Sequence, residues 1–221
     1  MSEHWREFLY PLGFIAPLAF GSRVLFQWLI SEARKESVVT GLFWKLSLAG
    51  NVSLWLHSIL QQQIHVALIQ SLNGVISWRN LNLMQPIEKQ ATLRKTVFLI
   101  LAAMAVTFFL FFIQGDYFRI PQVPWQTHAA NQVPVFWHIL GSIGLVLFNS
   151  RFWLQWICAE KYKKSYLGSA FWWISLAGDT LCLAYFALIY DPVNFIGPVL
   201  GLIPYVRNLM LIRRAAIRKS S

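Results

Sequence analysis

Two arginines in otherwise apolar stretches are the residues of this sequence best suited to binding chemistry. Arg23 precedes Gln27 by four positions and Arg151 precedes Gln155 by four, so each pair shares one face of a helix. Arginine can hold a phosphate through forked hydrogen bonds, and glutamine can adapt to sugar hydroxyls. Burying an arginine in a membrane costs about 2.5 to 3.5 kcal/mol, so each needs a reason. The pairs predict an anionic headgroup site; alternatively, each arginine pairs with a carboxylate or reaches the membrane surface.

Polar and aromatic residues also share a face in the helices that follow. Trp44 lies with Asn51 on one face, and Trp172 lies with Asp179. Tryptophan can stack on a sugar ring, although it is also common at membrane interfaces. Asp179 stands where the first set has Asn51, so either the site is asymmetric, or Asp179 pairs with an arginine, or a carboxyl in a cavity couples transport to protons.

The remaining polar candidates lie near helix ends. They are Glu32, Glu160, Arg79, Asn80, Arg207 and Asn208. The arginine and asparagine pairs fit either phosphate contact or the anchoring of a helix end. The glutamates are expected to anchor the basic segments that follow them, through Lys35, Lys163, Ser37 or Ser165.

Four residues predict a hinge in the last hydrophobic stretch. They are Gly197, Pro198, Gly201 and Pro204, where the first half has Ile69, Gln70, Asn73 and Ile76. Glycine and proline loosen a membrane helix, so bending is expected mainly in the second half. Cys158 and Cys182 match no metal or redox spacing, and neither a metal nor a cofactor is expected.

These candidates occur twice because the sequence repeats itself without a gap. Adding 128 to the numbers of Arg23, Gln27 and Glu32 gives Arg151, Gln155 and Glu160. The same offset relates Trp44, Ser47, Gly50, Arg79, Asn80 and Leu81 to Trp172, Ser175, Gly178, Arg207, Asn208 and Leu209. A repeat of this kind is typical of two equivalent helix bundles around a shared site, as in membrane transporters.

Composition places these residues in an all-α integral membrane protein. Hydrophobic residues make up 57% of the 221, charged residues only 13%, and the mean hydropathy is +0.49. Apolar stretches of about 20 residues, long enough to span a bilayer, predict seven transmembrane helices. They cover about 9–31, 41–60, 64–84, 96–114, 134–158, 168–190 and 193–212.

The seven spans group as three, one and three, which predicts two parallel three-helix bundles joined by a linker helix. The expected parts are repeat one at 9–84, the linker helix and outer loop at 85–133, repeat two at 134–212 and a basic cytoplasmic tail at 213–221. Most basic residues of the connections fall on one side, whereas the other side has Arg6 and Arg119. This bias predicts a cytoplasmic C-terminus and an outer N-terminus. It also explains most of the net charge of +10, so nucleic acid is not an expected partner.

The doubled pattern resembles the lipid A biosynthesis N-terminal domain family. It reads Arg-x3-Gln-Trp-x3-Glu-x4-Ser, then Phe-Trp-x2-Ser-x2-Gly, then Tyr-x-Arg-Asn-Leu, with Ser77 in place of the tyrosine in the first half. That family is similar in helix arrangement to the PQ-loop, SWEET and SemiSWEET transporters. The resemblance implies association with lipid A or envelope glycolipid pathways in a bacterial inner membrane, with a periplasmic N-terminus.

The family name implies lipid-A-disaccharide synthase, yet this sequence has no Gly-rich phosphate loop and no soluble stretch for a nucleotide-sugar fold. We therefore expect no enzyme here, but a transporter or flippase for an anionic lipid-linked or phosphorylated saccharide. The alternative is a non-transporting accessory subunit of a membrane glycosyltransferase. Membrane lipids, the sugar substrate and such a glycosyltransferase are the expected partners. A transporter needs a polar cavity lined by both repeats, whereas a scaffold can close the seam between them.

Overall fold

The computed structural model describes residues 4–36, 39–117, 134–162 and 167–220, and it contains seven long helices. They are α2 (Ile15–Arg34), α3 (Gly41–Leu60), α4 (Ile64–Leu83), α5 (Leu93–Gln114), α6 (Val135–Tyr162), α7 (Ser169–Leu188) and α8 (Pro192–Ser220). Short helical turns precede α2 (α1, His4–Leu9; η1, Tyr10–Phe14) and α5 (η2, Ile87–Lys89). The all-helical prediction is confirmed. Most of the expected outer loop (118–133) and four residues of a basic connection (163–166) lie outside the described residues.

Local sequence explains several of the helix boundaries. The Thr40 hydroxyl accepts a hydrogen bond from the backbone N–H of Phe43 at 3.4 Å and caps the start of α3. Thr92 does the same for α5, through the N–H of Lys95 at 3.3 Å. Gly115 ends α5 with φ of 73°, a left-handed conformation that glycine adopts without strain. α8 runs on to Ser220, so the segment expected as a tail continues the helix.

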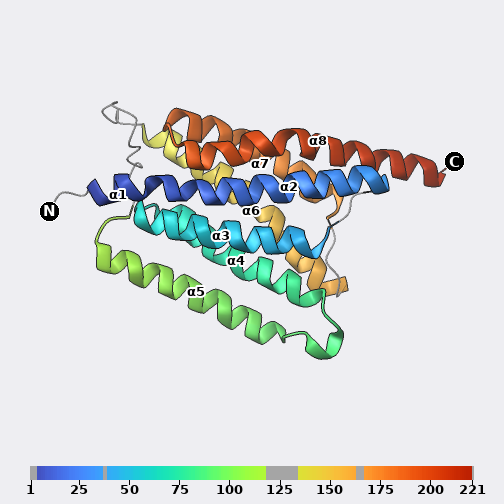
Figure 1. Ribbon diagram of the computed structural model, residues 1–221, viewed down its shortest axis with the longest axis horizontal. Coiled ribbons are helices and arrows are strands. Elements are labelled where there is room, and N and C mark those ends of the chain that lie inside the picture. Colours follow the sequence, from blue (N-terminus) through green and yellow to red (C-terminus); the bar gives the residue numbers. More distant parts are fainter. Residues whose placement is uncertain (1–3, 37–38, 118–133, 163–166, 221) are drawn as a thin grey trace.

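Six of the long helices form a closed ring in the order α2, α3, α4, α6, α7, α8. α3 packs on both α2 and α4, and α7 packs on both α6 and α8. Two contacts between the halves close the ring, α2 against α8 and α4 against α6. α5 packs mainly on α4, and Figure 1 shows it along one side of the molecule. Each of the six helices of the two repeats therefore lies beside the centre of the ring.

Corresponding helices of the two halves run in the same direction (Figure 1). α2, α4, α6 and α8 all finish at the end of the molecule where the C-terminus lies. We call this the basic end, because Arg34, Lys89, Lys161 and Arg213 lie there. The other end, where Tyr10 and Asp191 lie, is called the Tyr10 end.

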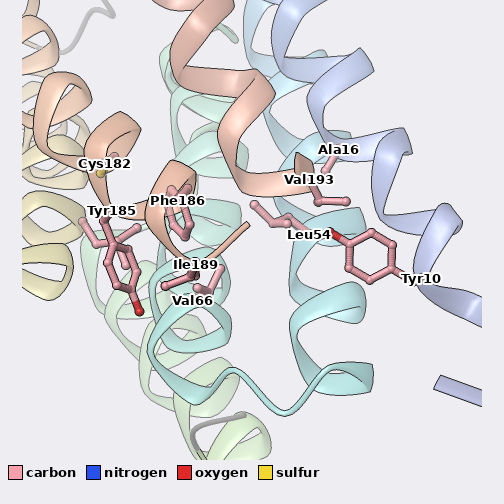
Figure 2. Close-up of a cluster of buried hydrophobic side chains, with 10 residues drawn as sticks. Tyr10, Ala16, Leu54, Val66, Cys182, Tyr185, Phe186, Ile189 and Val193 are labelled. Atoms are coloured by element: carbon pink, nitrogen blue, oxygen red, sulfur yellow. The ribbon is translucent and has the colours of Figure 1, made fainter. Parts of the chain in front are cut away.

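Two apolar clusters join the halves. Figure 2 shows the first, near the Tyr10 end, where Tyr10, Leu54 and Val66 of the first half meet Phe186 and Val193 of the second. The second cluster lies toward the basic end and contains Phe43, Trp44, Ile76, Phe152, Leu167, Phe171, Trp172 and Tyr205. Burial of these large side chains from both halves favours a single packed ring over two independent bundles.

Within the described residues, four segments are long and apolar enough to cross a membrane: Trp5–Arg34, Ile87–Gln114, Ser169–Leu188 and Pro192–Arg214. Large apolar side chains of α5, among them Phe98, Phe109 and Phe112, are exposed on its surface. A water-soluble protein rarely exposes apolar surface on this scale. The chain is a membrane protein.

Candidate functional site

A cavity of about 70 Å³ lies at the centre of the ring, lined by residues of all six ring helices. Arg23 and Val24 come from α2, whereas Arg151 and Phe152 come from α6. Among the described lining residues, none is Asp or Glu. One water molecule needs roughly 10 to 15 Å³ of such space, and a cavity that admits benzene measures about 150 Å³. The cavity as it stands can hold a few waters or one small anionic group.

Arg23 is buried beside this cavity and is 5% exposed. Its Nη1 donates to the Ser47 hydroxyl at 2.9 Å. Its guanidinium carbon lies 4.6 Å from the ring centre of Phe20 and 5.1 Å from that of Phe152. Aromatic faces stabilise a cation, but they leave hydrogen-bond donors unused. The Nε of Arg23 has no hydrogen-bond partner among the residues that the structure describes.

Arg151 is the repeat counterpart of Arg23 and is 1% exposed. Its guanidinium carbon lies 3.6 Å from the ring centre of Phe148 and 4.7 Å from that of Phe152. Within the described part of the chain, its Nε and Nη1 have no hydrogen-bond partner. The Phe152 ring thus lies close to both guanidinium groups, and the two positive charges border one cavity. The buried carboxylate of Asp179 is near enough to act on Arg151 electrostatically, and an anion in the cavity would accept hydrogen bonds from the donors that remain open.

Asp179 is completely buried, and neither carboxylate oxygen has a hydrogen-bond partner in the described residues. It is not among the residues that line the cavity. Its counterpart Asn51 does line the cavity and donates to the Ser77 hydroxyl at 3.0 Å. The two halves therefore differ at this position, as the sequence indicated.

Trp44 and Trp172 are buried in the apolar cluster toward the basic end, and neither is among the cavity-lining residues. The Ser47 hydroxyl donates to the Phe43 carbonyl at 2.7 Å, and that of Ser175 donates to the Phe171 carbonyl at 2.5 Å. Because both indole rings are buried in this apolar cluster, both tryptophans contribute to helix packing. Stacking on a sugar ring stays a prediction.

Two ion pairs join the halves at the basic end, and they are repeat counterparts of each other. Arg79 on α4 donates its Nε to Glu160 Oε1 on α6 at 2.5 Å, and its Nη2 to Glu160 Oε2 at 2.9 Å. Arg207 on α8 pairs with both carboxylate oxygens of Glu32 on α2. The glutamates thus pair across the halves with arginines, whereas we expected the following lysines or serines as partners. Of those, Ser37, Lys163 and Ser165 lie outside the described residues.

Two amide pairs join the same helices and follow the same symmetry. The Gln27 Nε2 donates to Asn208 Oδ1 at 3.0 Å, and the Asn208 Nδ2 donates back at 3.2 Å. Gln155 and Asn80 exchange the equivalent bonds, at 2.7 and 3.0 Å. Gln27 and Gln155 therefore bond across the halves, although each follows its arginine by one helical turn. We call these four amides and the two ion pairs the clamp.

At the Tyr10 end, Asp191 gathers polar groups of both halves. Its carboxylate accepts from Tyr10 Oη at 3.0 Å, from Asn194 Nδ2 at 2.7 Å and from Gln63 Nε2 at 3.3 Å. Gln63 and Asp191 are themselves related by the offset of 128. A residue that touches its own counterpart lies on the axis between two equivalent halves. Sequence reasoning missed this cluster, although the repeat offset aligns the two residues.

The four expected hinge residues lie in α8, which continues through both of its prolines. Gly197 and Pro198 line the cavity. A Cβ on Gly201 would lie within 2.5 Å of the Tyr205 hydroxyl, and the Pro204 carbonyl accepts from Asn208 Nδ2 at 2.9 Å. The segment from Gly197 to Pro204 therefore extends from the cavity to the clamp, and bending there stays a prediction. In the part of the chain that the structure describes, no group of three or more His, Cys, Asp or Glu could hold a metal ion.

Comparison of the sequence with known proteins places the chain in a family. The lipid-A-disaccharide synthase of Chlamydia felis is 39% identical over 215 residues, which cover 95% of this chain and 34% of the relative. That of Chlamydia muridarum is 36% identical over 221 residues, covering 96% of this chain and 35% of the relative. The chain thus spans about a third of the length of these relatives. No solved structure matches it. Because the family pattern matches twice, at residues 12–82 and 140–210, the chain belongs to the Lipid A Biosynthesis N-terminal domain family.

Proposed function

We propose that this protein is a membrane transporter or flippase for an anionic lipid-linked or phosphorylated saccharide of lipid A-related biosynthesis. The observation that carries the proposal is the central cavity, which Arg23 and Arg151 border from opposite halves. Two buried cations with open hydrogen-bond donors form a site that an anion would complete. The substrate class follows from the family and from the name of its synthase relatives.

Polar contacts between the halves lie at both ends of the ring and support alternating access. The clamp joins the halves at the basic end, and the Asp191 cluster joins them at the Tyr10 end. Opening one set while the other holds would expose the cavity to one side at a time. Since the cavity of about 70 Å³ is too small for a sugar ring, transport requires such an opening.

The proposed topology has seven spans in a SWEET-like arrangement of two parallel three-helix bundles and a linker helix. The basic end would face the cytoplasm of a bacterial inner membrane, and the N-terminus the periplasm. The clamp would then be the cytoplasmic gate, and the Asp191 cluster the periplasmic gate.

A second candidate is an accessory subunit of a membrane glycosyltransferase. The observation that favours it is the length of the synthase relatives, of which this chain covers about a third. Such a subunit would need no substrate movement. Lipid flipping by the purified protein alone therefore separates the two candidates.

Binding to the detergent-purified protein tests the anion site. A polyprenyl-phosphate sugar should bind the wild type, and Arg151→Gln should weaken binding about tenfold or more, since charge-assisted hydrogen bonds contribute about 1.5 to 3 kcal/mol. Arg213→Gln removes an exposed arginine of α8 and is the control. Equal affinity of wild type and Arg151→Gln would overturn the assignment of the site.

A further inference from the structure

A second hollow, much larger than the central cavity, opens between α3, α4 and the linker helix α5. Its volume is about 460 Å³, within the range of roughly 300 to 1,000 Å³ typical of ligand pockets. Its walls are almost entirely apolar and include Val52 and Trp55 of α3, Val75 of α4, and Ala102 and Val106 of α5. We call this hollow the linker groove.

The linker groove and the central cavity have two wall residues in common. Asn51 and Gln70 line both, so they separate the groove from the cavity that Arg23 and Arg151 border. The Gln70 side chain is 7% exposed, and its Oε1 has no hydrogen-bond partner within the described residues. A buried amide oxygen without a partner is unfavourable, and a donor group of a ligand would satisfy it.

The groove also has open space beside Gly74 of α4. Gly74 lines it without a side chain, and a Cβ built there would have only Asn51 Cβ within 4 Å, at 3.9 Å. The polar side chains of the described lining are Asn51 and Gln70, which the groove shares with the central cavity, and Ser71, whose hydroxyl donates to the Leu68 carbonyl at 2.8 Å; the other lining residues are apolar. This polarity matches a molecule with a long hydrocarbon chain and a polar head.

We infer that the linker groove holds the hydrocarbon tail of a phosphate-headed lipid whose headgroup passes Asn51 and Gln70 toward Arg23 and Arg151. The inference rests on the proposed function, because it takes the central cavity as the headgroup site. The apolar walls select a hydrocarbon tail, and the arginines beyond the amides select a negative head over a neutral one. The linker helix then has a function besides joining the repeats, since it supplies one wall of the groove.

Photolabelling of the full chain in lipid nanodiscs tests this inference. The probes are a polyprenyl phosphate with a diazirine in its tail and the uncharged polyprenol with the same tail. In the wild type we expect labelled peptides from α3, α4 and α5 at the groove, with more label from the phosphate than from the alcohol. Equal labelling by the two probes would overturn the selection of an anionic lipid. Crosslinks between two copies of the chain at these residues would show a different occupant.

A matched pair of variants on α5 sharpens the test. Ala102 lines the linker groove, whereas Ala105 is exposed and is not among its lining residues. Ala102→Trp should reduce groove labelling to the level of a sample kept in the dark, and Ala105→Trp should leave it at the wild-type level. Groove labelling that survives Ala102→Trp in a folded protein would contradict the inference.

The photolabelling result and the lipid-flipping result can be interpreted independently of each other. If the wild type is labelled in the groove but moves no lipid, the groove assignment stands and the transport proposal fails. If the wild type moves lipid and the groove peptides carry no label, the groove inference alone fails.

Discussion

At the scale of single residues, the repeat places chemically identical side chains in unequal surroundings. Arg79 and Glu160 are 2% and 14% exposed, whereas their counterparts Arg207 and Glu32 are 27% and 45% exposed. A buried charge that loses its partner is strongly unfavourable, but an exposed one is stabilised by water and salt. The two ion pairs of the clamp should therefore contribute very differently to stability.

Arg79→Ala should lower the free energy of unfolding by about 3 kcal/mol, because it removes the cation that neutralises the largely buried Glu160 and leaves the Trp156 indole, 3.1 Å from Oε1, as a neutral donor to it. Arg207→Ala, the same change at the counterpart position, should cause only a small loss. Unfolding of both variants in detergent by thermal or denaturant titration measures the difference. Equal losses would show that burial does not distinguish the two pairs.

A second contrast at the residue scale concerns glycines at helix contacts. A Cβ on Gly178 of α7 would lie 2.4 Å from the backbone nitrogen of Phe148 on α6, which cannot move without shifting the helix. Gly74 of α4 has room for a Cβ. Gly178→Ala should therefore destabilise the protein by about 1 to 3 kcal/mol, the usual effect of overpacking. Gly74→Ala, measured by the same unfolding assay, should not destabilise it through a clash.

At the scale of helices, sequence patterns predicted the elements but not their partners. The long apolar stretches predicted each of the seven helices close to its observed position, because hydropathy along a segment is a local property. The pairing of Glu160 with Arg79 depends on how α4 meets α6 when the ring closes. No local pattern records that contact, so the sequence led to nearby lysines and serines instead.

The residues that line the central cavity could likewise be predicted only in part from the sequence. The offset of 128 identified Arg23 and Arg151 as equivalent, and both line it. It also marked Gln27 and Gln155 as candidates for the site, yet each bonds an asparagine of the other half. One turn along a helix separates a cavity residue from a clamp residue, and only the contacts between the halves distinguish them.

The contacts of α2 with α8 and of α4 with α6 define where the ring should open. Cysteines replacing Gln27 and Asn208, in a background without Cys158 and Cys182, would allow the halves to be crosslinked at the clamp by a short bifunctional thiol reagent. Crosslinking should abolish lipid movement, and cleavage of the crosslink should restore it. Either single cysteine treated with the same reagent is the control. Full movement with the crosslink in place would exclude opening at the clamp.

At the scale of the whole molecule, the closed ring of six helices explains how the sequence repeat surrounds a central cavity. The repeat supplies two equivalent halves, and polar contacts join them at both ends of a central cavity. The cavity contains buried positive charge without a carboxylate among its described lining residues. On these features we propose that an anionic group moves between the halves, and a purely structural assembly is the alternative.

Lipid flipping is the most direct test of this account. The measurement compares the movement of a fluorescent polyprenyl-phosphate sugar across proteoliposomes that contain the wild type, Arg23→Gln, Arg151→Gln or the control Arg213→Gln. We predict rapid movement with the wild type and the control, and movement at the protein-free rate with the two cavity variants, provided that both remain folded. A wild type that moves no lipid-linked sugar faster than empty liposomes would contradict the account.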